Sequence, residues 1–282
     1  MLRRRFDAHL GDPKKSLIGY LTFRFMRDRN VFLEKCMVEK LDPRVDDNVL
    51  EIGFGPGTGI LAAYKKLKGG SGKVFGVDCS TFMVNEAEKL CSEAVQAGRV
   101  QLHEGLVSHM PFPDDFFHGV FHSNCYYFWP DRRLALLEIL RVLRPQGVMV
   151  TGMFLDGLKR LKEQGYMAPE TYERSDPVVY MEDLETAGFR DVKILYTNLA
   201  MSSLVEYYSY KGKLTYQIIY ASKPPQETKD LERSWEEAAK LLRTVKEDAV
   251  KDGRRRDMLG AQRHIQKEAQ EVMQKSEEKK VE

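Results

Sequence analysis

Long apolar runs, an excess of one charge and cysteine pairs are all missing from this chain of 282 residues. No stretch of about 18 apolar residues occurs, so we expect no membrane-spanning segment. The net charge of +2 creates no strong field, and we therefore expect no nucleic-acid partner. The cysteines, which lack C-x-x-C spacing, argue against a zinc site and against a disulfide framework; they are Cys36, Cys79, Cys91 and Cys125.

The same cysteine usage favours a reducing compartment, and we expect a cytoplasmic protein. A basic start with Arg3, Arg4 and Arg5 leaves a mitochondrial address open as the alternative. Two acids, Asp7 and Asp12, follow soon after, and mitochondrial addresses avoid acids.

Two common nucleotide-binding motifs are also missing. The fingerprint G-x-G-x-x-G needs a glycine where Thr58 stands, and no G-x-x-x-x-G-K-[ST] loop begins at Gly53. What is present is an apolar strand at 49–52 that leads into alternating glycines and then a helix over 60–67. The glycines allow a ligand to approach the backbone, and the N-terminus of the helix is expected to face that ligand. The pattern predicts an adenosine-like ligand across this turn.

A second strand, at 73–78, ends in Asp78, which lies 27 residues after Glu51. This spacing fits one βαβ step, and an acid at the tip of the second strand can accept hydrogen bonds from both ribose hydroxyls of an adenosine. Ser80 is expected to cap a helix over 81–97.

Further strands are expected at 99–103, 119–123 and 148–154, with helices at 134–143 and 181–187. Gly188 ends the second of these helices, and breakers make 156–176 irregular. Strands at 190–196 and 214–221 should add to the sheet as an antiparallel pair. The predicted fold class is α/β, a Rossmann-like, seven-stranded, mostly parallel sheet with helices on both faces, plus a charged C-terminal helix.

The run Glu51-x-Gly-x-Gly-x-Gly, together with Asp78, Pro-Phe-Pro-Asp at 111–114 and Leu-Arg-Pro-x-Gly at 143–147, resembles the class I S-adenosylmethionine-dependent methyltransferases. It looks like the branch that contains ubiquinone and menaquinone C-methyltransferases and many small-molecule methyltransferases. The resemblance implies that S-adenosylmethionine is the cofactor and that its methyl group goes to an unidentified small-molecule acceptor. It implies cofactor contacts from Glu51, Gly53, Phe54, Gly55, Gly57, Asp78, Cys79, Ser80, Met83, Gly105, Leu106, Val107 and Asn124.

Two positions depart from the family pattern. Leu106 stands where many relatives have an Asp whose carboxylate accepts a hydrogen bond from the adenine amino group. A leucine can pack on the adenine ring but cannot accept this bond, so backbone groups of Leu106 and Val107 would hold the adenine edge. His118 stands where relatives often have Asp before the fourth strand.

No catalytic triad is expected, because methyl transfer mainly requires positioning and needs a base only when the acceptor must lose a proton. The candidates are His109, Tyr127 and Asp131, of which His109 can also be a solvated loop residue and Asp131 an ordinary helix start. Aromatic residues at 126–129 could line a pocket for a cationic sulfonium. His118 and His122 share one face of a strand, but no acid or cysteine completes a metal set, and we expect no metal.

Three regions are expected: an N-terminal helical lid at 1–40, a cofactor-binding domain at 41–222 and a charged helical tail at 223–282. The first of these can equally be a helix that covers the sheet edge. In the tail, 29 of 60 residues are charged and apolar residues recur at heptad spacing from Leu231 to Ala249.

The tail leaves several functions open. It can be a docked or solvated helix, or it can pair with a protein partner or a second copy through 229–275. The alternatives to small-molecule methylation are a methyltransferase-like scaffold protein that acts through this helix, and a protein methyltransferase. Tyr207, Tyr208 and Tyr210 can wall a substrate pocket or pack on the sheet.

Overall fold

A computed structural model describes residues 9–199 and 214–225. The chain divides into two compact units, 1–226 and 227–282, and all described residues belong to the first. The three tyrosines Tyr207, Tyr208 and Tyr210 and the heptad pattern of the tail lie outside the described residues.

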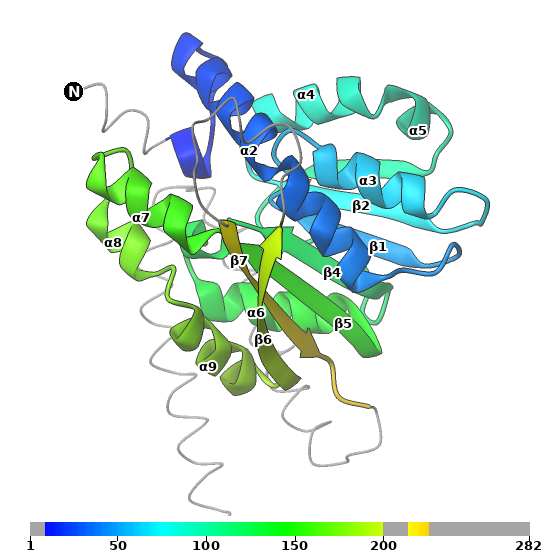
Figure 1. Ribbon diagram of the computed structural model, residues 1–282. Coiled ribbons are helices and arrows are strands. Elements are labelled where there is room, and N and C mark those ends of the chain that lie inside the picture. Colours follow the sequence, from blue (N-terminus) through cyan, green and yellow to red (C-terminus); the bar gives the residue numbers. More distant parts are fainter. Residues whose placement is uncertain (1–8, 200–213, 226–282) are drawn as a thin grey trace, which may run out of the picture. The chain divides into compact units, whose positions relative to one another are not determined.

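The described part of the chain forms one seven-stranded sheet with the order β3-β2-β1-β4-β5-β7-β6 (Figure 1). The strands are β1 Asn48–Ile52, β2 Lys73–Asp78, β3 Val100–Glu104, β4 Phe117–Ser123, β5 Leu143–Met153, β6 Arg190–Leu199 and β7 Leu214–Ser222. The first five run parallel, and β7 pairs antiparallel with both β5 and β6. The predicted sheet and its antiparallel addition are therefore confirmed.

The helices cover both faces of the sheet (Figure 1). They are α2 Leu17–Leu41, α3 Thr58–Lys66, α4 Thr81–Leu90, α5 Ser92–Gln96, α6 Arg132–Val142, α7 Leu155–Glu163, α8 Pro169–Glu173 and α9 Pro177–Ala187, with a 3-10 turn η1 at Tyr126–Phe128. Helices α2, α3 and α4 pack together on one face, and α6 packs with α9 on the other. The crossover connections between parallel strands are all right-handed. Because the strand order reverses between β1 and β4, the helices before and after this point lie on opposite faces of the sheet. This reversal places a ligand crevice at the carboxyl ends of β1 and β4.

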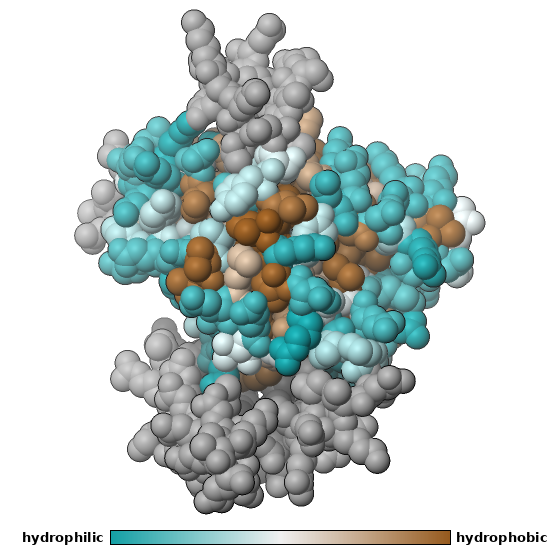
Figure 2. Space-filling view, turned by 60° about the horizontal axis from the view of Figure 1, so that its bottom comes forward, coloured by the Kyte–Doolittle hydropathy of each residue, from teal (hydrophilic) through white to brown (hydrophobic). Residues whose placement is uncertain are grey.

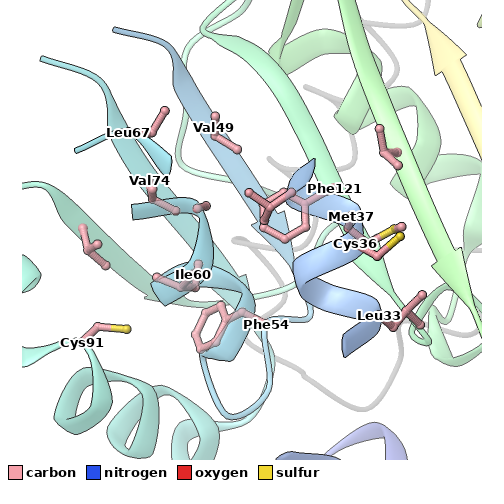
Figure 3. Packing of buried hydrophobic residues seen from close by; sticks show 14 of the residues in the cluster. Leu33, Cys36, Met37, Val49, Phe54, Ile60, Leu67, Val74, Cys91 and Phe121 are labelled. Atoms are coloured by element: carbon pink, nitrogen blue, oxygen red, sulfur yellow. The ribbon is translucent and has the colours of Figure 1, made fainter. Parts of the chain in front are cut away.

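The core on the α2 side fills the space between the helices and the sheet (Figure 3). Leu33 and Met37 of α2 are fully buried, and a Cβ at Gly152 would lie 2.5 Å from the Met37 sulfur. The glycine therefore lets α2 pack directly on β5. The C-terminal half of α2 is a core element that holds the central strands in place.

Three sequence predictions of local structure were wrong. The helix expected over 81–97 breaks into α4 and α5 at Cys91, whose side chain is buried and points its Sγ to the Gly57 carbonyl oxygen at 3.8 Å. β5 begins at Leu143, directly after α6, rather than at 148.

The segment 156–176, expected to be irregular, contains most of α7 and all of α8. Its breakers are compatible with helices, because Gly157 lies in the first turn of α7, Gly165 follows its end, and Pro169 opens α8 where no amide is needed.

The surface is mixed. Figure 2 shows a face on which hydrophobic side chains gather in the centre between hydrophilic borders. Among the large apolar side chains that remain exposed are Leu17 and Leu21 at the start of α2. Within the described ranges, no helix combines the length and apolar character needed to cross a membrane.

Candidate cofactor and acceptor site

The glycine turn after β1 is held by three left-handed residues. Gly53, Gly55 and Gly57 have φ values of 64°, 49° and 85°. A Cβ at Gly57 would lie 2.7 Å from the Ala87 Cβ, so this glycine lets α4 pack against the turn. At Gly55 the nearest atom to such a Cβ is the Met26 methyl at 3.7 Å. Gly55 is therefore the glycine of the turn that borders the open site.

The amides of the first turn of α3 hydrogen-bond to carboxylates of the protein itself. Glu34 of α2 accepts hydrogen bonds from the Thr58 hydroxyl and the Gly59 amide, and Glu51 accepts one from the Ile60 amide. A Cβ at Gly59 would lie 2.2 Å from Glu51 Oε1, so only glycine leaves room for this carboxylate. The protein's own carboxylates thus satisfy the first amides of the helix.

Burial dominates the electrostatics beneath the turn. It raises the pKa of Glu34 to about 7 and holds the pKa of Glu51 well above its usual range, and the neighbouring charges of Glu34 and Asp78 raise the pKa of Glu51 further. Among the described residues, no group hydrogen-bonds to Glu51 Oε2. Glu51 therefore supports the turn from below, and its backbone lies in the strand rather than in the site.

Asp78 ends β2 beside the glycine turn. Its Oδ2 accepts a hydrogen bond from the Gly55 amide at 2.8 Å, and its Oδ1 accepts one from the Ser80 amide at 2.9 Å. The side chain is buried, and burial raises the pKa of its carboxyl from 3.8 to about 6 despite these two bonds. This carboxylate stands where an acid would bind a ribose.

A short segment before α2 covers the same edge of the sheet. The Ser80 hydroxyl donates to the Pro13 carbonyl, and the Cys79 thiol lies 3.4 Å from the Gly11 carbonyl oxygen. A Cβ at Gly11 would meet the Phe128 ring at 2.9 Å. Residues 11–13 thus contact both the start of α4 and η1, which follows β4.

The loop after β3 contacts the end of β2 through its backbone. The Gly105 amide donates to the Asp78 carbonyl at 2.9 Å, and Leu106 is half-buried. Val107 is buried, as are Met83 and Phe54. A Cβ at Gly76 would lie 2.6 Å from the Phe54 ring, which shows that this ring packs into the core (Figure 3).

Asn124 links three elements at the carboxyl end of β4. Its backbone is left-handed with φ 48°. Its Oδ1 accepts a hydrogen bond from the Phe154 amide at 3.0 Å, and its Nδ2 donates to Asn30 Oδ1 at 3.2 Å. The side chain therefore ties α2 to the end of β5.

The predicted catalytic candidates do not share one place. Tyr127 is buried, and burial raises the pKa of its phenol well above its usual range, so the phenol stays protonated. Asp131 caps α6 by accepting a hydrogen bond from the Leu134 amide at 2.9 Å, which is the ordinary helix start. His109 is exposed in the loop after β3.

The two histidines of β4 have different surroundings. His118 Nδ1 accepts a hydrogen bond from the Asn48 amide at 3.0 Å. His122 is fully buried, and its Nε2 lies 2.9 Å from both the Tyr180 and Thr151 hydroxyls. Burial lowers the pKa of His122 to about 3, which keeps the ring neutral. Across the described ranges, no group of three or more His, Cys, Asp or Glu residues is placed to hold a metal.

A pocket of about 50 Å³ adjoins this site, and most of it was missed by the sequence analysis. Its wall is formed by Leu10, Phe25, Met26, Arg29, Asn30, Asn124, Tyr127, Phe128, Phe154, Gly157, Leu158, Leu161 and Met167. Met26 and Asn124 connect it to the glycine turn and to the end of β4. The available signal was the apolar spacing of Leu155, Leu158 and Leu161, which the breakers obscured.

Comparison with known proteins agrees with this geometry. Residues 49–147 match the family model described as a methyltransferase domain. The uncharacterized methyltransferase YdaC of Bacillus subtilis is 27% identical over 183 residues, which are 65% of this chain and 91% of YdaC. A ubiquinone/menaquinone biosynthesis C-methyltransferase, UbiE of Vibrio vulnificus, is 30% identical over 104 residues, 37% of this chain and 40% of UbiE.

Solved structures share the fold at lower identity. A methyltransferase in complex with the Trm112 methyltransferase activator of Haloferax volcanii gives a TM-score of 0.59 at 19% identity, and the match covers 78% of this chain and 97% of that chain. A SAM-dependent methyltransferase from Aquifex aeolicus gives 0.55 at 18% identity over 71% of this chain and 96% of that chain. At these identities the likeness shows the fold.

Proposed function

Because this chain belongs to the class I S-adenosylmethionine-dependent methyltransferase family, we propose that it transfers a methyl group from S-adenosylmethionine to a small-molecule acceptor. The observation that carries the proposal is the pairing of two features at one edge of the sheet. Asp78 stands beside the glycine turn, and the amides that begin α3 are taken by Glu34 and Glu51. A site with a ribose acceptor and no helix N-terminus for a phosphate favours an adenosine ligand without phosphates.

The cofactor supplies an activated methyl group on a sulfonium. Asp78 is proposed to accept the ribose hydroxyls, and Gly55 leaves the backbone open to the ligand. The half-buried Leu106 would pack on the adenine, with the amides of 106–107 at its edge. The Tyr127 ring would lie beside the sulfonium, since aromatic faces attract cations. Asn124 holds α2 against the end of β5, and it would thereby fix the position of the pocket relative to the glycine turn.

The test is calorimetric titration of the full chain with S-adenosylmethionine and with S-adenosylhomocysteine. We expect micromolar binding that Asp78→Ala weakens at least tenfold, because a charged acceptor of ribose hydroxyls is lost. Glu88→Ala, an exposed acid on α4, is the matched control and should leave binding unchanged. Absence of binding at millimolar cofactor would refute the proposal. Once binding is established, formation of S-adenosylhomocysteine with an acceptor panel measures turnover.

A protein partner for the segment 229–275 stays a prediction. Its support is the heptad pattern in the sequence and the fact that a protein of the same fold was solved with a protein activator. Deleting 227–282 at the boundary of the two units would test it: loss of self-association or partner binding with cofactor binding retained is the expected result.

A further inference from the structure

The first two turns of α2 carry no charged residue on any face. The uncharged stretch covers residues 17–23. On the inner side of the helix Thr22 and Phe23 are buried, and the following turn places Phe25 and Met26 in the wall of the pocket. A helix that is apolar on all sides is normally buried on all sides. Packing against the protein accounts for only one side of these two turns.

The outer side of the same turns is apolar and exposed. Leu17, Tyr20 and Leu21 are 78%, 48% and 54% exposed. Tyr20 and Leu21 follow Leu17 by three and four positions, so the three side chains are neighbours on one side of the helix. In Figure 1 the start of α2 (dark blue) extends beyond the sheet. Single exposed apolar residues are ordinary, whereas a contiguous group of them marks an interaction surface.

Positive charge borders this apolar group. Between residues 9 and 29 the chain has five Lys or Arg residues and two Asp, although the whole chain has a net charge of only +2. Lys15 directly precedes the N-cap of α2, and Arg24 stands one turn after Leu21 on the same side of the helix; both side chains are exposed. Each of the two acids is paired with a neighbouring cation: Asp12 with Lys14, and Asp28 with Arg27.

An apolar centre with positive borders fits the surface of an anionic lipid bilayer. Leucine side chains enter the boundary between headgroups and acyl chains, tyrosine rings lie at the level of the headgroups, and Lys and Arg meet lipid phosphates. The charge separates this partner from a second copy of the chain, because a copy would bring the same positive border against this one.

We propose that the start of α2 docks on an anionic lipid surface through Leu17, Tyr20 and Leu21, with Lys15 and Arg24 at the headgroups. The docking surface is the outer side of the helix, and the pocket wall is on its inner side. The proposal therefore does not depend on the proposed function, and either can fail without the other.

The charge is tested by co-sedimentation of the full chain with two kinds of vesicle, phosphatidylcholine alone and an equal mixture of phosphatidylcholine and phosphatidylglycerol. Binding to the mixed vesicles should be at least about tenfold tighter, because each cation at an anionic surface contributes about fivefold. Lys15→Gln combined with Arg24→Gln should remove most of this preference. Lys65→Gln combined with Lys68→Gln removes the same charge from two exposed lysines near the end of α3 and should leave the preference unchanged.

The apolar group is tested with the same mixed vesicles. Leu17→Ser combined with Leu21→Ser should weaken binding at least about tenfold, because two leucine side chains no longer leave water for the bilayer. Both positions are exposed, so thermal unfolding of this variant should match the wild type. The control is Val178→Ser combined with Val179→Ser on α9, where the side chains are 61% and 43% exposed, and it should bind as the wild type does.

Several results would overturn the proposal. They are equal binding to the two kinds of vesicle, binding to neither, and binding that survives in the leucine double variant. Sedimentation velocity without lipid addresses the second copy: a wild-type dimer that the leucine double variant dissociates would show that this surface belongs to an interface between copies. A wild-type chain that is monomeric in this experiment, and whose vesicle binding the leucine double variant loses, supports docking on lipid.

Discussion

Acidification should weaken cofactor binding through Asp78. In the ligand-free protein, burial raises the pKa of this carboxyl to about 6, and the bonds from the Ser80 and Gly55 amides only partly offset the burial. The negative charge of Asp12 raises this pKa further, and Glu51 and Glu34 lie beneath the same turn. Ribose hydroxyls donate to the ionised carboxylate, so the bound state favours the charged form and binding should release a proton below pH 6.

The magnitude follows from the ionised fraction of Asp78. With a pKa of about 6, roughly nine-tenths of the free protein is ionised at pH 7 and roughly one-tenth at pH 5. If only the ionised form binds, the affinity falls about tenfold between these values, which corresponds to about 1.4 kcal/mol. The amino and carboxyl groups of the cofactor titrate outside this interval.

The assay is calorimetric titration of S-adenosylhomocysteine at pH 5, 6 and 7 in buffers of different ionisation enthalpy, which reports proton release directly. Asp78→Asn should bind more weakly at pH 7 and show no such dependence. Glu34→Gln, which removes a neighbouring carboxyl beneath the turn, should retain it. An affinity that does not change between pH 5 and 7, or a dependence that survives in Asp78→Asn, would refute the reasoning.

Three further predictions concern the scaffold. Gly57→Ala should lower stability by about 1–3 kcal/mol in thermal unfolding, because φ is 85° and the new Cβ overlaps Ala87. Gly69→Ala is the control: its φ is 101° but no atom lies within 4 Å of the new Cβ, so it should lose less stability. Equal losses in the two variants would contradict the packing argument. Asn124→Gly keeps the left-handed backbone but loses the bonds to Phe154 and Asn30, and denaturant titration should show a loss of about 1–3 kcal/mol. For Glu34 the native pKa of about 7 exceeds the ordinary 4.5, so between these values the native protein holds a proton that the unfolded chain has lost, and stability falls as the pH rises from about 4.5 to 7. Glu34→Gln should therefore melt above the wild type at pH 8, and the gap in melting temperature should narrow steadily as the pH falls toward 4.5.

The parallel sheet could be predicted because each of its first strands ends in a feature with a strict physical role. Gly53 and Gly57 need left-handed backbones, and Asp78 ends a strand that is buried on both sides. Such residues have few alternatives, and their spacing alone places them at one edge. The hydrogen bonds that Glu34 accepts at the start of α3 could not be predicted, because Glu34 comes from another helix and only tertiary packing brings it there.

The prediction of helix ends from glycine and proline was wrong where such a residue lies inside a helix. Gly157 was interpreted as a stop, yet it lies in the first turn of α7 against Phe154, where a Cβ would be 2.4 Å from the ring. Cys91 was interpreted as a helix interior residue, yet it divides α4 from α5 because its buried side chain lies against the glycine turn. For Cys91 a contact with a residue far along the chain outweighed local propensity. For Gly157 the contact is with Phe154, the N-cap of the same helix.

The residues around the glycine turn and those of the neighbouring pocket differ in how well they can be predicted from the sequence. The cofactor side is built from backbone at turns, where glycine and a single acid are the only workable choices. The neighbouring pocket is lined by α2, η1 and α7, and most of their contributions are apolar side chains that could serve equally well in any core. Arg29 shows the difference: in the sequence it is one of several arginines near the start of the chain, and only the folded structure places it in the wall of the pocket, near the Phe25 and Phe154 rings. The lining of this pocket thus depends on contacts between elements that are far apart in the chain, and such contacts cannot be read from local sequence patterns.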